Sequence, residues 1–372
     1  MRHTYYPALD GLRTVAVGIV LCAHGGVTWF RSGGVGVDIF FVLSGFLITT
    51  ILRTERQRTG AISFRNFYTR RFLRLAPALV LTCGLVAVAK PALGEPFPGT
   101  DIALALSYTA NWAQALHGYY MTWLNHCWSL AIEEQFYLIW PLVILGLERT
   151  VRAPTTKVGL LLAGAAGIAV YRAWHVGIWT DERINFGLDT RMDSLMTGAA
   201  LSYVVQAVTE WNARVAAGRR DAATEQPVWT QALQGKALGW FLAPLSLATL
   251  FLIPNVVTWY SPWMGWIGYV IVAGLSATVL SDLVLGRHSL LAPVLATRPM
   301  VFVGKISYGL YLLHLPVYFA VEKLIPGAPL VVRLGWKMGV SLALATMSFY
   351  WVEKRFLKLK DRFSADHADG RG

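Results

Sequence analysis

Apolar runs about as long as a membrane-spanning helix recur from one end of the chain to the other, and they limit its fold more than any other feature. A helix needs about 20 mostly apolar residues to cross the hydrocarbon core of a bilayer. The runs lie at residues 9–29, 35–53, 76–92, 101–116, 128–148, 157–175, 187–207, 237–254, 264–284, 301–322 and 330–352. Charged residues make up 15% of the sequence, against about 25% in soluble domains. We therefore predict an all-α polytopic integral membrane protein.

The charge of the connecting loops indicates which runs cross the membrane, because loops rich in Lys and Arg stay on the cytoplasmic side. Basic loops lie at residues 53–74, 148–157, 210–236 and 286–298 and in the C-terminal KRFLKLKDR. Basic and non-basic loops alternate along the whole chain with ten spans, but not with eleven. We predict about ten transmembrane helices with both termini cytoplasmic. Residues 1–360 would form the transmembrane domain and residues 361–372 a short polar cytoplasmic tail.

The run at 101–116 is the one that we leave out of the spans. It is short and contains the polar residues Asn111 and Gln114. The Pro- and Gly-rich stretch KPALGEPFPG before it is typical of a loop. We predict that residues 91–126 form an outer-side segment that lies on the membrane or re-enters it.

The net charge of +12 suits three kinds of partner: nucleic acid, anionic lipid or a phosphorylated ligand. The basic residues are scattered between apolar runs and form no nucleic-acid-binding motif. We therefore expect no nucleic acid partner, and we attribute most of the excess to cytoplasmic loops that face membrane lipids. The cysteines Cys22, Cys83 and Cys127 fit no metal-binding spacing, so we expect no metal centre.

The first span carries two ionisable residues, Arg13 and His24. Their spacing places them about 16 Å apart along a helix and within ~20° of the same face. The topology puts Arg13 near the cytoplasmic side and His24 in the outer half. A neutral imidazole is a natural general base, so His24 is a candidate catalytic residue. Alternatively, Arg13 extends to the lipid headgroups and His24 is an interfacial residue bonded to backbone.

Two adjacent carboxylates, Glu133 and Glu134, lie inside the span that begins with WSLAIEEQFY. Adjacent helical residues point about 100° apart, so only one of them faces the bundle interior directly. Glu133 falls at a depth similar to His24 and is a candidate catalytic partner. A structural ion pair with an arginine is the alternative.

The sequence RRFLR before the third span contains Arg70, Arg71 and Arg74. Guanidinium groups bind phosphate in a bidentate manner, which indicates a phosphate clamp. The alternative is a cluster of cytoplasmic positive charges that meets lipid phosphates.

Several other polar residues are candidates for a substrate or supporting role. Asp10 either caps the first span or pairs with an arginine, and Asp38 opens the second span. Asp193 follows Arg191 closely, which suggests a buried ion pair between them. Tyr311 and His314 share a helix stripe with Ser307, in a pattern that fits packing as well as catalysis. Ser44-Gly45 lacks the G-x-S-x-G elbow of a serine nucleophile and favours close helix approach.

Taken together, these motifs resemble those of the membrane acyltransferase-3 family. The matching stretches are LDGLRTVAVGIVLCAHGG, GVGVDIFFVLSGFLI, RRFLRLAP, WSLAIEEQFY, GKISYGLYLLHLPV and WVEKRF. The resemblance implies a ten-helix enzyme of the bacterial cytoplasmic membrane that moves an acyl group, commonly acetyl, from acyl-CoA to a hydroxyl. It also implies that Arg13, His24 and the RRFLR arginines are needed for activity and that Glu133 matches the family's first carboxylate.

The acceptor is less defined by this resemblance. Many surface-polysaccharide acetyltransferases of this type carry a C-terminal SGNH-like domain, whereas this sequence stops soon after its last span. It is similar to stand-alone members that acylate macrolide antibiotics or their sugars, so we expect such an acceptor. O-acetylation of a cell-surface glycan or lipid-linked sugar is the alternative. Two hypotheses from other classes are a proton-coupled transporter, although the chain shows no paired halves, and a lipid-binding scaffold.

The expected mechanism assigns a role to each motif. The acyl-CoA phosphates bind Arg13, Arg70, Arg71 and Arg74. His24 removes the acceptor proton and Glu133 orients the imidazole. The oxyanion is stabilised by Tyr311, Ser129 or a backbone N–H group.

Overall fold

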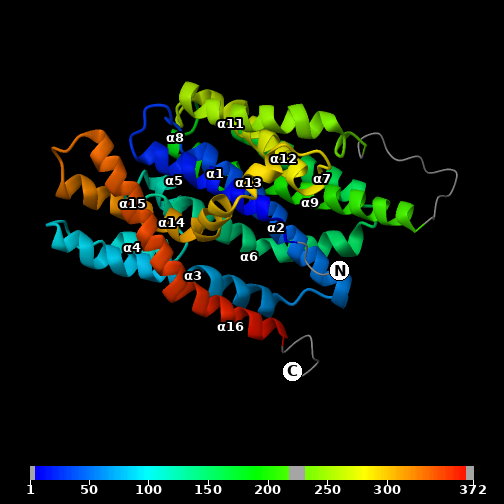
Figure 1. Ribbon diagram of the computed structural model, residues 1–372, viewed down its shortest axis with the longest axis horizontal. Helices are drawn as coiled ribbons and strands as arrows, with labels where there is room; N and C mark the ends of the chain where they lie inside the picture. Colours follow the sequence, from blue (N-terminus) through cyan, green and yellow to red (C-terminus); the bar gives the residue numbers. More distant parts are fainter. Residues whose placement is uncertain (1–4, 218–230, 366–372) are drawn as a thin grey trace.

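The computed structural model describes residues 5–217 and 231–365, and all regular structure in these ranges is helical (Figure 1). The long helices are α1 (Pro7–His24), α2 (Gly34–Thr59), α3 (Phe64–Ala92), α6 (Cys127–Thr150), α7 (Pro154–His175), α9 (Leu188–Ala216), α12 (Tyr269–Leu285), α14 (Arg298–Leu324) and α15 (Leu330–Ser348). The shorter ones are α4 (Gly99–Leu106), α5 (Ala110–His117), α8 (Asp181–Phe186), α11 (Ala243–Val256), α13 (Leu291–Leu295) and α16 (Lys354–Ala365). A 3₁₀ turn, η1 (Thr122–Leu124), and three π-helical turns, η2 (Leu238–Leu242), η3 (Met264–Gly268) and η4 (Phe349–Glu353), complete the set.

In the described parts of the chain, eight helical segments are long and apolar enough to cross a membrane. They are Pro7–His24, Gly34–Thr59, Phe64–Ala92, Cys127–Thr150, Pro154–His175, Leu238–Val256, Met264–Leu285 and Leu330–Leu359. A ninth candidate, α14, bends by 69° between Lys305 and Ser307. The remaining predicted span falls in α9, whose 29 residues are long enough to cross but are not among these candidates. The polytopic all-α class is therefore confirmed, and the count of ten stays a prediction.

The segment that we left out of the spans forms two separate helices. α4 and α5 have 8 residues each, so each is about 12 Å long and too short to cross a bilayer. They are joined at Tyr108, which adopts a positive φ of 54°. α16 extends to Ala365, and the rest of the predicted tail, residues 366–372, lies outside the described residues.

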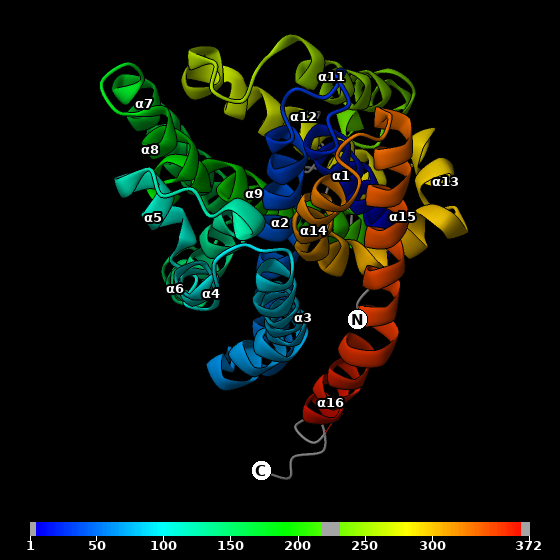
Figure 2. The same ribbon diagram turned by 90° about the vertical axis from the view of Figure 1, so that its left-hand side faces the viewer.

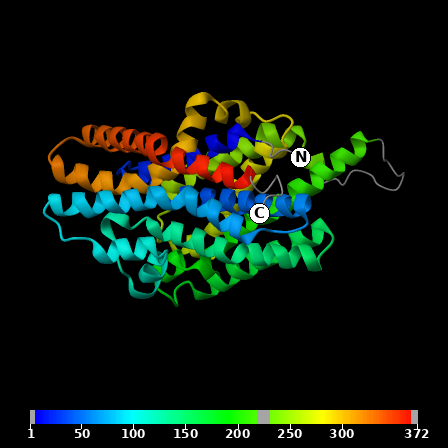
Figure 3. The same ribbon diagram turned by 90° about the horizontal axis from the view of Figure 1, so that it is seen from below.

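The long helices run roughly along the long axis of the molecule (Figures 1 and 3). α1 begins and α16 ends toward the same end of the molecule as the α2–α3 connection. α2 lies near the middle of the bundle and packs against α1, α6, α9 and α12 (Figure 2).

Glycines allow the central helices to approach closely. A Cβ added at Gly45 of α2 would lie 1.8 Å from the carbonyl oxygen of Leu195, and one at Gly198 of α9 would lie 1.9 Å from that of Val42. Each helix therefore presents a glycine to the backbone of the other, which is how helices pack tightly in membranes. The predicted role of Ser44-Gly45 in close helix approach is confirmed at Gly45.

Candidate active site

A cavity of about 190 Å³ lies inside the bundle and collects much of the predicted site. Its wall includes Arg13 of α1, Arg71 and Arg74 of α3, Glu133 of α6 and Tyr311 of α14. These residues are far apart in the sequence, and the packing of their helices brings them to one space. The serine and tyrosine hydroxyls of the wall belong to Ser44, Ser129, Tyr137, Ser307, Tyr308 and Tyr311.

The arginines of the cavity are held in different ways. The Arg13 Nη1 lies 2.7 Å from Asp10 Oδ1, so Asp10 is an ion-pair partner inside α1 and does not cap it. The Arg71 guanidinium lies 3.7 Å from the centre of the Tyr137 ring and 3.4 Å from Glu134 Oε1. Arg74 has no carboxylate within 4.0 Å among the described residues. An unpaired guanidinium beside two others makes this wall suitable for an anion.

Arg70 does not join the other arginines. Its Nη2 lies 3.2 Å from Glu55 Oε2, at the end of α2, and it does not line the cavity. Glu55 also accepts a hydrogen bond from the Ser63 backbone N–H, which closes the α2–α3 loop over this pair. Of the four arginines that the sequence predicted for a phosphate clamp, Arg13, Arg71 and Arg74 therefore line the cavity and Arg70 does not.

Hydroxyl groups and a carboxylate also contribute to the cavity wall. Ser44 donates a hydrogen bond to Glu133 Oε1 at 2.6 Å. The Ser129 and Tyr311 hydroxyl oxygens are 2.7 Å apart, and Tyr311 donates to the His126 carbonyl at 3.0 Å. Ser129 and Tyr311 therefore form a fixed pair of hydroxyls in the cavity wall.

Three imidazoles lie behind Tyr311. The ring of His314 is 5.0 Å from the rings of both His24 and His126, and the Tyr311 ring is 5.2 Å from that of His126. His314 is fully buried, whereas His24 ends α1 at an exposed position. His126 was not among the residues predicted from the sequence, where its one signal is its position two residues before the WSLAIEEQFY motif.

The hydrogen bonds of these rings determine where their protons are. A carbonyl oxygen only accepts, so His126 Nε2, 3.0 Å from Leu312 O, and His314 Nδ1, which contacts Tyr311 O, each carry a hydrogen. A neutral His314 then has its lone pair on Nε2, which lies 3.0 Å from His24 Nδ1. His24 must donate through Nδ1, and its own lone pair is on Nε2.

Glu133 and His24 are not hydrogen-bonded to each other, although their predicted depths match. The partner of His24 is His314, and the partner of Glu133 is Ser44. α14 supplies both Tyr311, which lines the cavity, and His314, which contacts His24. The geometry supports His314, rather than Glu133, as the residue that orients His24.

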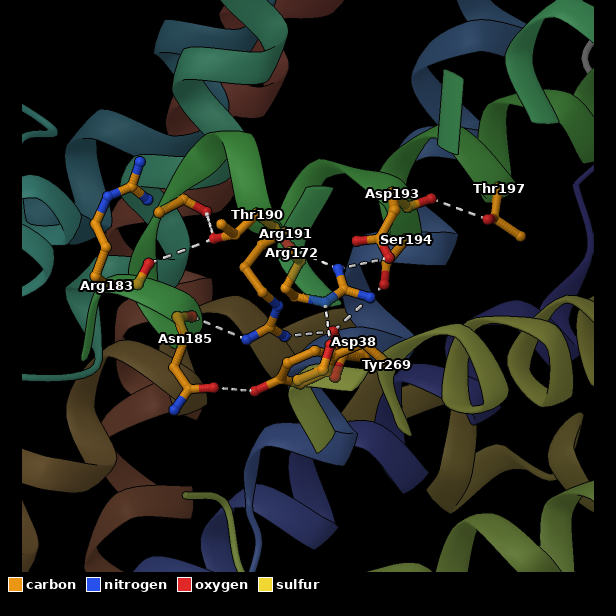
Figure 4. Close-up of polar contacts among 12 residues, drawn as sticks. Asp38, Arg172, Arg183, Asn185, Thr190, Arg191, Asp193, Ser194, Thr197 and Tyr269 are labelled. Carbon is orange, nitrogen blue, oxygen red and sulfur yellow. Dashed lines mark hydrogen bonds and ion pairs between the residues drawn. The ribbon is translucent and has the colours of Figure 1, made fainter. Parts of the chain in front are cut away.

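Asp38 and Asp193 belong to a separate buried network (Figure 4). Arg191 Nη2 lies 2.5 Å from Asp38 Oδ1, and Arg172 Nη1 lies 2.7 Å from Asp193 Oδ2. The expected Arg191–Asp193 pair is therefore wrong, because each residue pairs across helices instead. Arg191 also lies 3.7 Å from the centre of the Tyr269 ring. None of these residues lines the cavity, so they support the bundle rather than contact a substrate there.

A family model described as an acyltransferase domain matches residues 6–352. The chain belongs to this family, the membrane acyltransferase-3 proteins. No solved structure matches the chain significantly.

Relatives in this family come from several bacteria. The peptidoglycan O-acetyltransferase OatA of Listeria monocytogenes is 31% identical over 94% of the chain and 55% of its own length. YrhL of Bacillus subtilis, a candidate peptidoglycan O-acetyltransferase by name, is 32% identical over 95% of the chain and 55% of its own length. A candidate O-acetyltransferase of Staphylococcus aureus is 28% identical over 95% of the chain and 58% of its own length. The chain thus spans little more than half the length of these relatives.

Proposed function

We propose that this protein transfers an acetyl group from a cytoplasmic acyl-CoA to a hydroxyl of a cell-envelope glycan such as peptidoglycan. The observation that carries the proposal is the cavity in which Arg13, Arg71 and Arg74 share one space with Glu133 and Tyr311. The names of the relatives favour a glycan acceptor over the macrolide that we expected from the sequence.

The arginine wall suits the donor. Coenzyme A carries phosphates, and guanidinium groups bind phosphate with paired hydrogen bonds. Arg74, which has no carboxylate partner, is the most available of the three for this role. In this proposal Arg70 is not part of the clamp, because it is paired with Glu55.

The imidazole pair suits the proton transfer. His24 Nε2 takes the proton of the acceptor hydroxyl as the oxygen attacks the thioester carbonyl. The tetrahedral intermediate collapses to the ester and a CoA thiolate, which takes the proton back from the imidazolium. His314 accepts the Nδ1–H of His24 throughout and holds the ring in the reactive tautomer. The Tyr311 side chain lies between the cavity and the imidazoles, so in this proposal it moves aside for the acyl group.

The test is acetyl transfer by purified protein in nanodiscs, with acetyl-CoA as donor and peptidoglycan fragments as acceptor, read by product mass and thiol release. His24→Ala should lower the rate by about 100-fold or more, the usual contribution of a general base. The matched control is His117→Ala, on the exposed end of α5, which should keep the wild-type rate. Near wild-type turnover by His24→Ala would remove it as the base. Transfer to a macrolide but not to the glycan would overturn the acceptor.

A further inference from the structure

A second, wider cavity of about 630 Å³ adjoins the first one. It lies between α1, α2 and α9, and its wall shares Arg13, Leu47 and Ile51 with the narrow cavity. Ligand sites for drug-sized molecules are usually about 300–1,000 Å³, so the wide cavity can hold a nucleotide-sized group and the narrow one only a slender arm. We call the wide cavity the vestibule.

The vestibule contains a buried arginine, Arg53, that has no carboxylate partner among the described residues and whose guanidinium lies 5.9 Å from the centre of the Tyr203 ring. Arg53 is 7% exposed, and it has no carboxylate within 4.0 Å and no hydrogen bond among the described residues. The nearest acids are already engaged, since Glu148 binds Lys157 and Tyr203 while Glu210 binds Gln206. A buried unpaired cation is costly, so this position calls for an anion.

The rest of the vestibule wall adds to the positive charge. Arg58 and Arg214 are exposed at its rim and have no ion pair in the described ranges. Asp10 and Glu210 are its only acidic wall residues among those described, and Asp10 is paired with Arg13. The wall therefore carries two more positive than negative charges, 4 arginines against 2 acids. An organic phosphate with several negative charges complements it.

We propose that the vestibule binds the 3′-phosphoadenosine 5′-phosphate end of acyl-CoA, with Arg53 as the buried anchor. The phosphopantetheine arm then passes Arg13, which belongs to both walls, into the narrow cavity and brings the thioester toward Glu133 and Tyr311. This inference rests on the proposed function for its ligand. An anionic lipid headgroup carries the same phosphate chemistry, and the experiment separates the two sources.

The experiment compares two donors in nanodiscs, acetyl-CoA and acetyl-4′-phosphopantetheine, which lacks the nucleotide. Arg53→Leu should raise the KM for acetyl-CoA by about 10- to 100-fold, as expected for a lost charged hydrogen bond. It should leave the KM for acetyl-4′-phosphopantetheine and both kcat values unchanged. The matched control is Arg56→Leu on the same helix, which bonds the Gly60 carbonyl at 3.4 Å, lies outside both cavities and should leave both KM values unchanged.

Each other outcome also decides the inference. An equal rise in KM with both donors would show a structural role for Arg53 and overturn the inference. An unchanged KM for acetyl-CoA would also overturn the inference. Loss of co-purified phosphatidylglycerol in native mass spectra, with unchanged KM values, would assign the vestibule to lipid. If Arg53→Leu does not fold, the double variant Arg58→Ala/Arg214→Ala tests the exposed rim by the same comparison.

A binding measurement separates this inference from the proposed function. 3′,5′-ADP should bind the wild-type protein in calorimetry and bind Arg53→Leu at least about 10-fold more weakly. If the wild type transfers acetyl from neither donor but binds 3′,5′-ADP through Arg53, the proposed reaction fails and the nucleotide site stands. If 3′,5′-ADP does not bind the wild type, the nucleotide site fails.

Discussion

The buried network around Arg191 allows a stability prediction that can be worked out from the contacts. Arg191 and Asp38 are both 0% exposed and 2.5 Å apart. In Arg191→Leu, Asp38 keeps only the Ser194 hydroxyl, 3.4 Å away, because its Oδ2 already has no partner. Removing one member of a buried ion pair leaves an uncompensated charge and costs about 3–5 kcal/mol. We expect a loss of this size in the free energy of unfolding.

The assay is unfolding in mixed micelles at increasing mole fractions of dodecyl sulfate, followed by circular dichroism. The double variant Asp38→Asn/Arg191→Leu removes both charges, so it should lose less than the sum of the two single variants. The control is Asp189→Asn, because the Asp189 side chain is 40% exposed in its pair with Arg183 and such pairs contribute about 1 kcal/mol or less. A cost below about 1 kcal/mol for Arg191→Leu, or fully additive losses, would refute the reasoning.

Three further predictions concern the site and the helix packing. His314→Gln keeps an acceptor for His24 Nδ1–H, so it should retain most of the kcat that His314→Leu loses. ¹⁵N NMR of the His24 ring should show the Nδ1–H tautomer in the wild type and lose that preference in His314→Leu. Arg74→Ala should raise the KM for acetyl-CoA by about 10-fold or more with little change in kcat. Arg70→Ala should leave this KM unchanged, and steady-state kinetics with varied donor concentration will test both variants. Gly198→Val places a side chain against the carbonyl of Val42, so we expect little folded protein. Size-exclusion chromatography after detergent extraction measures this, and a monodisperse peak at wild-type yield would contradict the close contact.

The sequence predicted the class of fold and much of the cavity, because both depend on patterns within single helices. Apolar runs locate the helices, and loop charge excludes residues 101–116 from the spans. The RRFLR motif predicts an anion-binding cluster, and its Arg71 and Arg74 line the cavity, whereas Arg70, at the i,i+4 spacing from Arg74, pairs with Glu55 instead. Arg13 joins them because α1 and α3 both border this space.

The partners of these residues could not be predicted, because they come from other helices. Arg191 and Asp193 are two positions apart and point to different faces of α9, so each finds a partner on another element. Glu133 and His24 share a predicted depth, but depth says nothing about which helix lies between them. The buried Arg53 was read as part of a basic loop, and only the packing of α2 against α9 shows that it lines a cavity.

The neighbouring imidazoles of His24, His314 and His126 also determine whether protons can pass along them. The inward N–H groups of His314 and His126 both end on backbone carbonyl oxygens, at Tyr311 and Leu312. A carbonyl in this position accepts a hydrogen bond but has no proton to donate, so the three imidazoles do not form a proton-conducting chain. A proton that His24 takes up at Nε2 is therefore given up from the same nitrogen and is not passed on through His314. In the topology that the sequence predicts, with His24 in the outer half and the arginines near the cytoplasmic side, these imidazoles therefore do not conduct protons between the two sides.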